Sequence, residues 1–186
     1  MRMSSRDGDI ERADIGYLAG IIDGEGCLSI AVAKREDSAF KLNIKPILNI
    51  TNTDRKLIEA VQTILGKLGI KNRVSRYHAA PNRRSDGYRI HVTSPEELAR
   101  ILPVLIPYLI SKRRRAELIL AYVLKRRRKL RMFKSGSKQS RYGPEEFSMA
   151  ERIRNEIALS SGKTWSRHPR TAFALRQLMN QSLLTQ

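Results

Sequence analysis

Two carboxylates, Asp23 and Glu25, stand beside glycines directly after an apolar run from Ile15 to Ile22. Carboxylate oxygens are ligands that Mg²⁺ favours, and glycine lets a metal ion or a phosphate come close to the main chain. The run is too short to span a bilayer, so it is a buried helix or strand. In a helix, Gly16 and Gly20 lie one turn apart and form a face with almost no side chain, which a second backbone can approach closely. The segment therefore predicts a helix, packed against a partner and ended by a glycine-rich turn, that carries an acidic group into a site.

The charge of the chain indicates the class of its partner. The 186 residues carry a formal net charge of +18 and a sequence pI near 10.7. Surfaces this basic bind polyanions, because phosphates release counterions on binding. Nucleic acid is the first candidate; a membrane role is not expected, because the N-terminus mixes acidic with basic residues and no apolar run is long enough. The single cysteine, Cys27, excludes an internal disulfide framework and predicts an intracellular, reducing environment.

Periodicity and turn residues predict the order helix, two strands, helix, two strands, then helices. Residues 40–51 alternate apolar with polar residues, which is typical of a strand with one buried face, and Pro46 within them indicates a sheet edge or a bulge. Asp54 begins a helix that Gly69 ends, and Ser94 caps another. The other expected elements are strands over 27–35, 73–78 and 88–93, a helix break within 102–108, and a helix over 112–130 with inward-facing Ala116, Ile119, Leu120, Val123 and Leu124.

The polar side chains of the predicted sheet form a candidate surface for DNA. Alternate residues of such a face can read base edges while loops and helix ends hold phosphates. The candidate DNA-binding residues are Ser29, Ala31, Ala33, Arg35, Asn43, Lys45, Asn49, Ser75, Tyr77, Arg83, Arg84, Arg89 and His91.

The string from Leu18 to Gly26, Leu-Ala-Gly-Ile-Ile-Asp-Gly-Glu-Gly, closely resembles the nine-residue signature of the LAGLIDADG homing endonucleases. The resemblance, to the single-motif, intron-encoded type, implies an α+β fold: an αββαββα core with a saddle-shaped antiparallel sheet, plus C-terminal helices. Residues 1–130 would form this core, residues 131–144 a basic linker, and residues 145–186 a C-terminal helical extension.

The resemblance also implies the roles of the motif. Glu25 would bind a divalent ion, Mg²⁺ or another such as Mn²⁺, assisted by the carbonyl of Gly24, and Asp23 would be structural. One motif per chain implies a homodimer and a pseudo-palindromic target. The implied dimer interface is the motif helix, with Ile15, Gly16, Leu18, Ala19, Gly20, Ile22 and Asp23.

Two further segments resemble the family's catalytic segments. Residues 107–112, Pro-Tyr-Leu-Ile-Ser-Lys, correspond to the segment that supplies an active-site lysine, here Lys112. Residues 50–56 correspond to the strand-to-helix junction that supplies a water-positioning amide, here Asn52, and a basic residue, either Arg55 or Lys56.

The implied function is site-specific, metal-dependent cleavage of double-stranded DNA at a long pseudo-palindromic intron insertion site, which leaves 3′ overhangs. The alternatives are an RNA maturase that binds intron RNA and a non-cleaving DNA-binding regulator on the same fold. The expected location is intracellular, in the cytoplasm or nucleoid of a prokaryote or the interior of an organelle, and not secreted.

Overall fold

The computed structural model describes residues 12–34, 42–78, 86–133 and 142–160. Its elements, in chain order, are α1 (Arg12–Glu25), β1 (Gly26–Lys34), β2 (Leu42–Asn52), α2 (Arg55–Lys67), β3 (Arg73–Tyr77), β4 (Gly87–Val92), α3 (Pro95–Leu105), the 3₁₀ helix η1 (Ile106–Tyr108), α4 (Arg113–Met132) and α5 (Pro144–Ser160). The order predicted from sequence is confirmed, and the helix break falls at Leu105, within the predicted range. None of the helices within these described ranges is long and apolar enough to cross a membrane.

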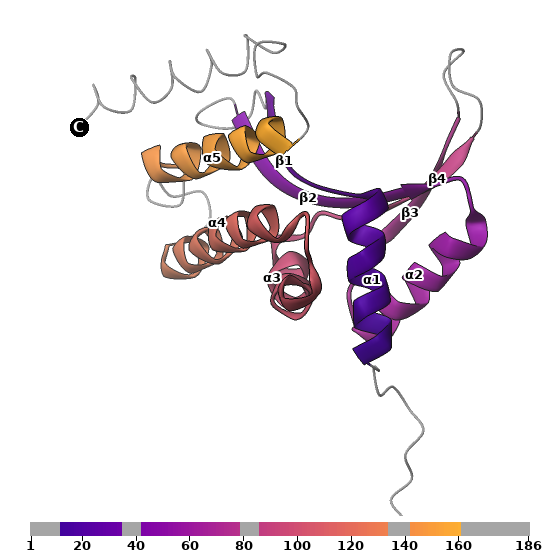
Figure 1. Ribbon diagram of the computed structural model, residues 1–186. Coiled ribbons are helices and arrows are strands. Elements are labelled where there is room, and N and C mark those ends of the chain that lie inside the picture. The colour runs from indigo at the N-terminus through magenta and orange to yellow at the C-terminus, as the bar shows by residue number, and fades with distance from the viewer. Residues whose placement is uncertain (1–11, 35–41, 79–85, 134–141, 161–186) are drawn as a thin grey trace, which may run out of the picture.

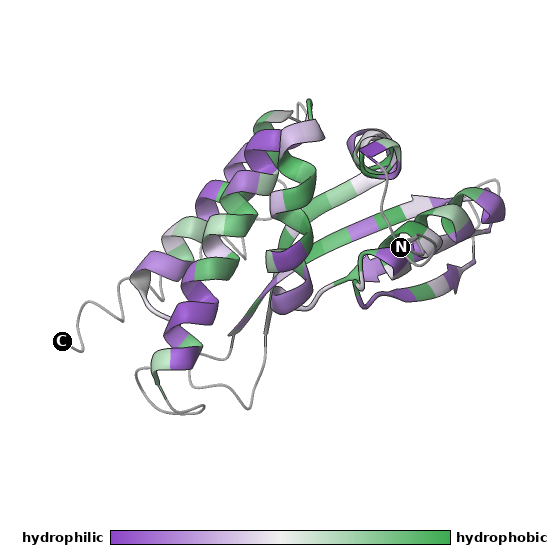
Figure 2. Cartoon of the chain, turned by 90° about the horizontal axis from the view of Figure 1, so that it is seen from below, coloured by the Kyte–Doolittle hydropathy of each residue, from purple (hydrophilic) through white to green (hydrophobic). Residues whose placement is uncertain are grey.

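The strands form one antiparallel sheet of order β1-β2-β4-β3. In Figure 1, α1, α2 and α3 lie on one face of this curved sheet. The alternation of hydrophobic with hydrophilic residues along the strands is visible in Figure 2. The apolar positions, among them Leu28, Leu48, Ile50 and Ile90, are almost fully buried beneath the helices. The opposite face carries the polar positions.

The junction of α1 with β1 differs from the predicted turn. The helix continues through Asp23 and Gly24 to Glu25, and the strand begins at the next residue, Gly26. A Cβ atom on Gly26 would lie 2.5 Å from the carbonyl oxygen of Ile22, so only glycine fits where the chain leaves the helix this abruptly.

Local side-chain chemistry sets the ends of α2 and α3 as predicted. The Asp54 carboxylate accepts hydrogen bonds from the amides of Lys56 and Leu57, and the Ser94 hydroxyl caps α3 in the same manner. Gly69, with φ of +62°, reverses the chain after α2.

Pro46 lies beside an edge of the sheet, and the register of β2 with β1 runs through it without a bulge. Pairing of β2 with β4 covers only residues 48–52, so the first half of β2 has β1 as its single strand neighbour. Two tyrosines cover this edge: the Ile44 amide donates to the hydroxyl of Tyr142 at 3.3 Å, and the hydroxyl of Tyr122 donates to the Ile44 carbonyl at 3.3 Å. Burial raises the pKa of the Tyr122 hydroxyl, which keeps it a donor.

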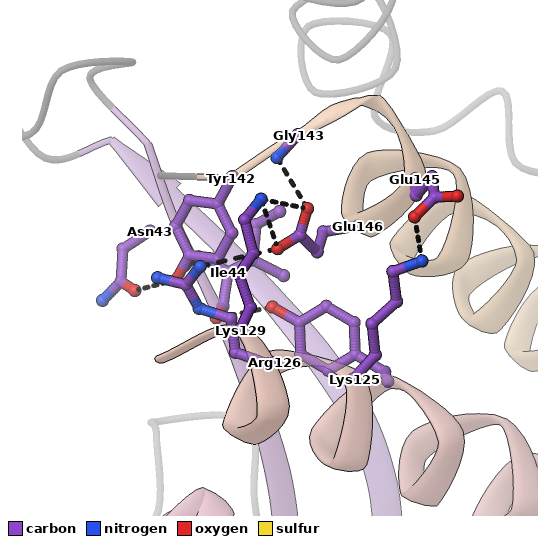
Figure 3. A network of polar contacts seen from close by, with 10 residues as sticks. Asn43, Ile44, Lys125, Arg126, Lys129, Tyr142, Gly143, Glu145 and Glu146 are labelled. Atoms are coloured by element: carbon purple, nitrogen blue, oxygen red, sulfur yellow. Dashed lines mark hydrogen bonds and ion pairs between the residues drawn. The ribbon is translucent and has the colours of Figure 1, made fainter. Parts of the chain in front are cut away.

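Helix α5 packs against α4 and β1, and its residues Phe147, Ala150 and Ile153 are fully buried in the common core. Figure 3 shows the polar contacts that hold its first turn. The Glu146 carboxylate, 2% exposed, pairs with Lys129 at 3.2 Å and Arg126 at 3.5 Å and accepts from the Gly143 amide at 2.6 Å. The first helix of the predicted C-terminal extension is therefore built into the core. Of the linker predicted at 131–144, its first two residues belong to α4 and its last begins α5, while residues 134–141, like residues 161–186, lie outside the described residues.

The long helix α4 presents Ala116, Ile119, Tyr122 and Val123 to the core. Leu124, predicted to face inward, is 49% exposed, whereas Tyr122 takes an inward position that the prediction missed. The buried side of α4 therefore differs from the predicted one, because this helix also covers the edge of β2 through Tyr122.

Candidate active site and nucleic-acid interface

Glu25 is the last residue of α1 and its side chain is exposed. Because Gly26 pairs with Ile50, the end of α1 lies at the same end of the sheet as the end of β2, where Asn52 is found. The carboxylate and the amide singled out from the sequence thus lie at one end of the sheet.

Asp23 binds the segment before α4, and we call its contacts with residues 110–112, together with those of Lys112, the clasp. Its carboxylate accepts hydrogen bonds from the amides of Ile110 at 2.6 Å, Ser111 at 3.3 Å and Lys112 at 3.0 Å, and from the Ser111 hydroxyl at 3.1 Å. Burial alone would raise the pKa of Asp23, but these donors outweigh it and lower the pKa. The structural role predicted for Asp23 agrees with these contacts, and its predicted place in the dimer interface stays a prediction.

Lys112, in the segment that Asp23 binds, in turn contacts the end of α1. Its ammonium donates to the carbonyls of Ile22 at 2.9 Å and Asp23 at 2.5 Å, so it caps the C-terminal end of α1. Burial lowers the pKa of Lys112, with Asp23 and Glu25 among the groups that oppose this shift. The two reciprocal sets of bonds hold Lys112 close to the helix end that carries Glu25, and they explain how Gly24 stays helical despite its low propensity.

The junction of β2 with α2 holds the predicted amide in a fixed orientation. The Oδ1 atom of Asn52 accepts from the Asp54 amide at 2.8 Å, so the Nδ2 donor of the same side chain points away from that contact. Arg55 pairs with Glu59 at 2.7 Å along the exposed surface of α2, and Glu59 raises the pKa of Arg55. Lys56 is exposed, and within the described part of the chain no ion pair engages it. Of the two alternatives, the geometry favours Lys56 as the cation available to a ligand.

A divalent ion fits this helix end only in part. The C-terminal end of a helix carries partial negative charge, α1 has no basic residue in its last turn, and Glu25 adds an exposed carboxylate. Within the residues that the structure describes, however, no three His, Cys, Asp or Glu side chains gather as a metal site. One chain supplies one carboxylate here, so a complete oxygen site needs ligands from outside the chain.

The candidate DNA-binding residues of the strands gather on one side of the sheet. Register aligns Ala31 with Lys45, Ala33 with Asn43, Asn49 with His91, and Ser75 with Arg89. Their neighbours Ile44, Leu48, Ile50, Ile90 and Val92 are buried on the helix side. The structure thus confirms the shared face that the alternation of the sequence predicted. Three of the candidates, Arg35, Arg83 and Arg84, lie outside the described residues.

The sequence did not predict three features of this face. Arg73 pairs with His91 in register and is exposed. Thr51 accepts a hydrogen bond from Arg89 at 3.1 Å, and period two from Asn49 could have found it. Asn43 accepts from the Tyr142 hydroxyl at 3.2 Å, a contact 99 residues apart that no local pattern contains.

The open face of α1 is narrower than predicted. Leu18, Ala19 and Ile22 are fully buried in the core of their own chain, so their side chains have no surface to offer a second chain. Ile15 is only partly buried against this core, and its predicted place in a dimer interface stays a prediction. On the other side, Cβ atoms built on Gly16, Gly20 and Gly24 would meet nothing within 4 Å, and Tyr17 is 46% exposed. Residues four apart share a helix face, and this glycine face, Gly16–Gly20–Gly24, is the surface that another backbone can approach.

An αββαββα core with helices on one face of an antiparallel sheet and an acidic helix end at one end of that sheet is the arrangement of the LAGLIDADG fold. The LAGLIDADG-like domain model matches residues 12–105, half of the chain. The chain belongs to this family.

Known relatives are similar in sequence and in structure. The chain is 27% identical to the DNA endonuclease I-CvuI of Chlorella vulgaris over 118 residues, 62% of this chain and 66% of that protein. It is 33% identical to the homing endonuclease I-ApeII of Aeropyrum pernix over 51 residues, 27% of this chain and 30% of that protein. The chain thus matches less than two thirds of the length of either relative.

Two solved structures share the fold. The archaeal intron-encoded homing endonuclease I-Vdi141I, complexed with DNA, gives a TM-score of 0.68 at 21% identity, covering 94% of this chain and 99% of that chain. I-CvuI in complex with a DNA target in the presence of Mg gives 0.64 at 22% identity, covering 91% and 94%.

Proposed function

We propose that the protein is a site-specific endonuclease that hydrolyses double-stranded DNA. The observation that carries the proposal is the clasp between Asp23 and Lys112, because it fixes the helix end that carries the exposed Glu25 at one end of the sheet. A pure binding protein needs the basic face but has no use for an exposed carboxylate on a helix end held in this way. The relatives I-CvuI and I-ApeII, both named as endonucleases, support the assignment.

The active unit is a homodimer, joined through the glycine face of α1. Each chain offers one exposed carboxylate at this helix end, and the dimer would bring two together. Twofold symmetry would match a pseudo-palindromic target, such as an intron insertion site. A Gly20→Leu variant would place a bulky side chain on this face and is expected to lose dimerisation and cleavage. Gly66→Leu, at another helical glycine with open space around it, is the control; a wild-type mass of one chain by light scattering, alone and on DNA, would contradict the dimer.

Glu25 and the carbonyl of Gly24 would hold a divalent ion, Mg²⁺ or Mn²⁺. When bound, such an ion neutralises charge on the scissile phosphate and activates water. Asn52 uses its Nδ2 donor to orient the attacking water, since its oxygen is engaged with Asp54. Lys112 keeps one of its three N–H groups beyond the two carbonyl contacts, and this group stabilises the extra negative charge of the transition state, together with Lys56.

A pair of variants tests the role of Glu25. Glu25→Gln is expected to bind duplex DNA as the wild type does and to lose Mg²⁺-dependent cleavage, because an amide is a poor ligand for this ion. Glu117→Gln, on α4, is the matched control and is expected to cut normally. Undiminished cleavage by Glu25→Gln would remove Glu25 from the mechanism.

RNA maturation is the second candidate function, and the surface of α4 favours it. Arg128 and Arg131 are exposed on a helix that packs its other side against α3 and α5. These charges could contact intron RNA without the sheet face. Tight binding of a structured intron RNA, weakened by Arg128→Ala together with Arg131→Ala, would support this function.

A further inference from the structure

A chain of three hydrogen-bonded side chains crosses β2, β4 and the edge strand β3 on the polar face. The Nδ1 atom of His91, on β4, lies 3.0 Å from the Oδ1 atom of Asn49 on β2. Its Nε2 atom lies 2.8 Å from the Ser75 hydroxyl on β3. All three side chains are half-buried, and we call this chain the Asn49–His91–Ser75 relay.

The relay has a defined polarity. An amide oxygen can only accept, so the Nδ1 atom of His91 carries a proton and donates it to Asn49. In the neutral ring the Nε2 atom then accepts from the Ser75 hydroxyl. Burial lowers the pKa of His91, and Arg89, Arg73 and Lys45, from the three strands around the ring, lower it further.

The relay limits what Asn49 can offer to a base. A free asparagine pairs in bidentate fashion with adenine, accepting from N6 and donating to N7. Here one of the two lone pairs of the amide oxygen is engaged by His91, so the Nδ2 donors are the groups of Asn49 most open to a base. Guanine shows two acceptors, N7 and O6, at the same edge, whereas adenine shows one acceptor beside a donor.

We propose that His91 is a positioning residue that restricts Asn49 to a donor, so that the base opposite Asn49 is read as guanine and adenine is rejected. This inference rests on the proposed function, because it needs the polar face to meet the major groove. His91 acts through Asn49 and touches no base in this role.

The test compares base preferences of two variants on a randomised duplex library, by binding without metal ions, so that it does not depend on cleavage. His91→Phe keeps a ring but frees the Asn49 oxygen; the expected result is a shift from guanine towards adenine at one base pair of each half-site, by about 5- to 100-fold. His78→Phe, the same change at an exposed histidine outside the relay, is expected to leave the profile unchanged. Adding Asn49→Ala to His91→Phe is expected to abolish the new preference.

A uniform loss across all sequences in His91→Phe, or an adenine preference already present in the wild type, would overturn the proposal. A second measurement needs neither DNA nor a variant. Imidazole ¹⁵N NMR of the free protein above pH 7 is expected to show the His91 proton on Nδ1; a proton on Nε2 would overturn the relay's polarity while leaving the proposed function intact. Absence of any sequence-selective DNA binding would instead reject the proposed function.

Discussion

Removing the Asp23 carboxylate should loosen the end of α1 more than any other single change on that helix's surface. The carboxylate accepts four hydrogen bonds, two on Oδ2 from Ile110 and Ser111 and two on Oδ1 from Ser111 and Lys112. Each bond at this partly exposed position contributes about 0.5–1 kcal/mol net, so Asp23→Ala should cost about 2–4 kcal/mol.

Asp23→Asn keeps the shape of the side chain but removes the negative charge and one acceptor oxygen. The amide keeps one oxygen and sets an NH₂ group against backbone donors, so two bonds are lost and about 2 kcal/mol is expected. Ser111→Ala removes one donor and should cost about 0.5–1 kcal/mol. The free energy of unfolding is measured by urea titration at a fixed chain concentration, since dimerisation would make it concentration-dependent.

The order of the three variants decides the interpretation. We expect Asp23→Ala to be the least stable, Asp23→Asn intermediate and Ser111→Ala closest to wild type, with cleavage falling in the same order because the clasp positions Glu25. Wild-type stability in Asp23→Asn would refute the clasp, because a neutral amide cannot replace a carboxylate among four donors.

Three other outcomes are expected. Glu146→Gln should lower the free energy of unfolding by about 3 kcal/mol, because it removes the buried negative charge that pairs with the half-buried Lys129 and Arg126; a loss below about 1 kcal/mol would contradict the role of this carboxylate in docking α5. Lys56→Ala should slow DNA cleavage at least tenfold, whereas Arg55→Ala should have little effect because Arg55 already pairs with Glu59; the reverse order in kinetic assays would reassign the basic role. Folding lowers the pKa of His91, so the free energy of unfolding should be highest above pH 6.5, the ordinary value, and should fall as the pH drops from there towards the folded pKa. This pH dependence should be absent in His91→Gln, and its persistence in that variant would exclude His91 as the cause.

The polar face was predictable from the sequence because strand geometry has a fixed period. Residues two apart in a strand share a face whatever the rest of the chain does, so the alternation alone places Lys45 and Asn49 on the same side of the sheet. The capping of α2 by Asp54 is likewise local, since its partners are two and three residues away.

Helix orientation and long-range contacts were harder to predict. An unbroken apolar run does not reveal which side of α1 is buried. The resemblance to the motif therefore assigned Leu18, Ala19 and Ile22 to a dimer interface, whereas these side chains are buried in the core of their own chain. The spacing of Gly16, Gly20 and Gly24 marks the side of α1 that stays open. Contacts such as that of Tyr142 with β2 depend on tertiary packing across about half of the chain, and no local pattern encodes them.

The Lys112 contact shows the same limit at the candidate site. The resemblance assigned this residue to the active site, but the sequence contained no sign that its ammonium also caps α1. That second role follows from the close approach of the segment before α4 to the helix end.

The most direct test of the central claim is to incubate the protein with a randomised duplex library and Mg²⁺ and to sequence the ends produced. We predict paired ends with short 3′ overhangs around a pseudo-palindromic sequence, and, with EDTA in place of Mg²⁺, duplex that is bound but whole. If Mg²⁺ yields no ends from any sequence while a structured intron RNA is bound tightly, the endonuclease assignment is contradicted and the maturase function replaces it.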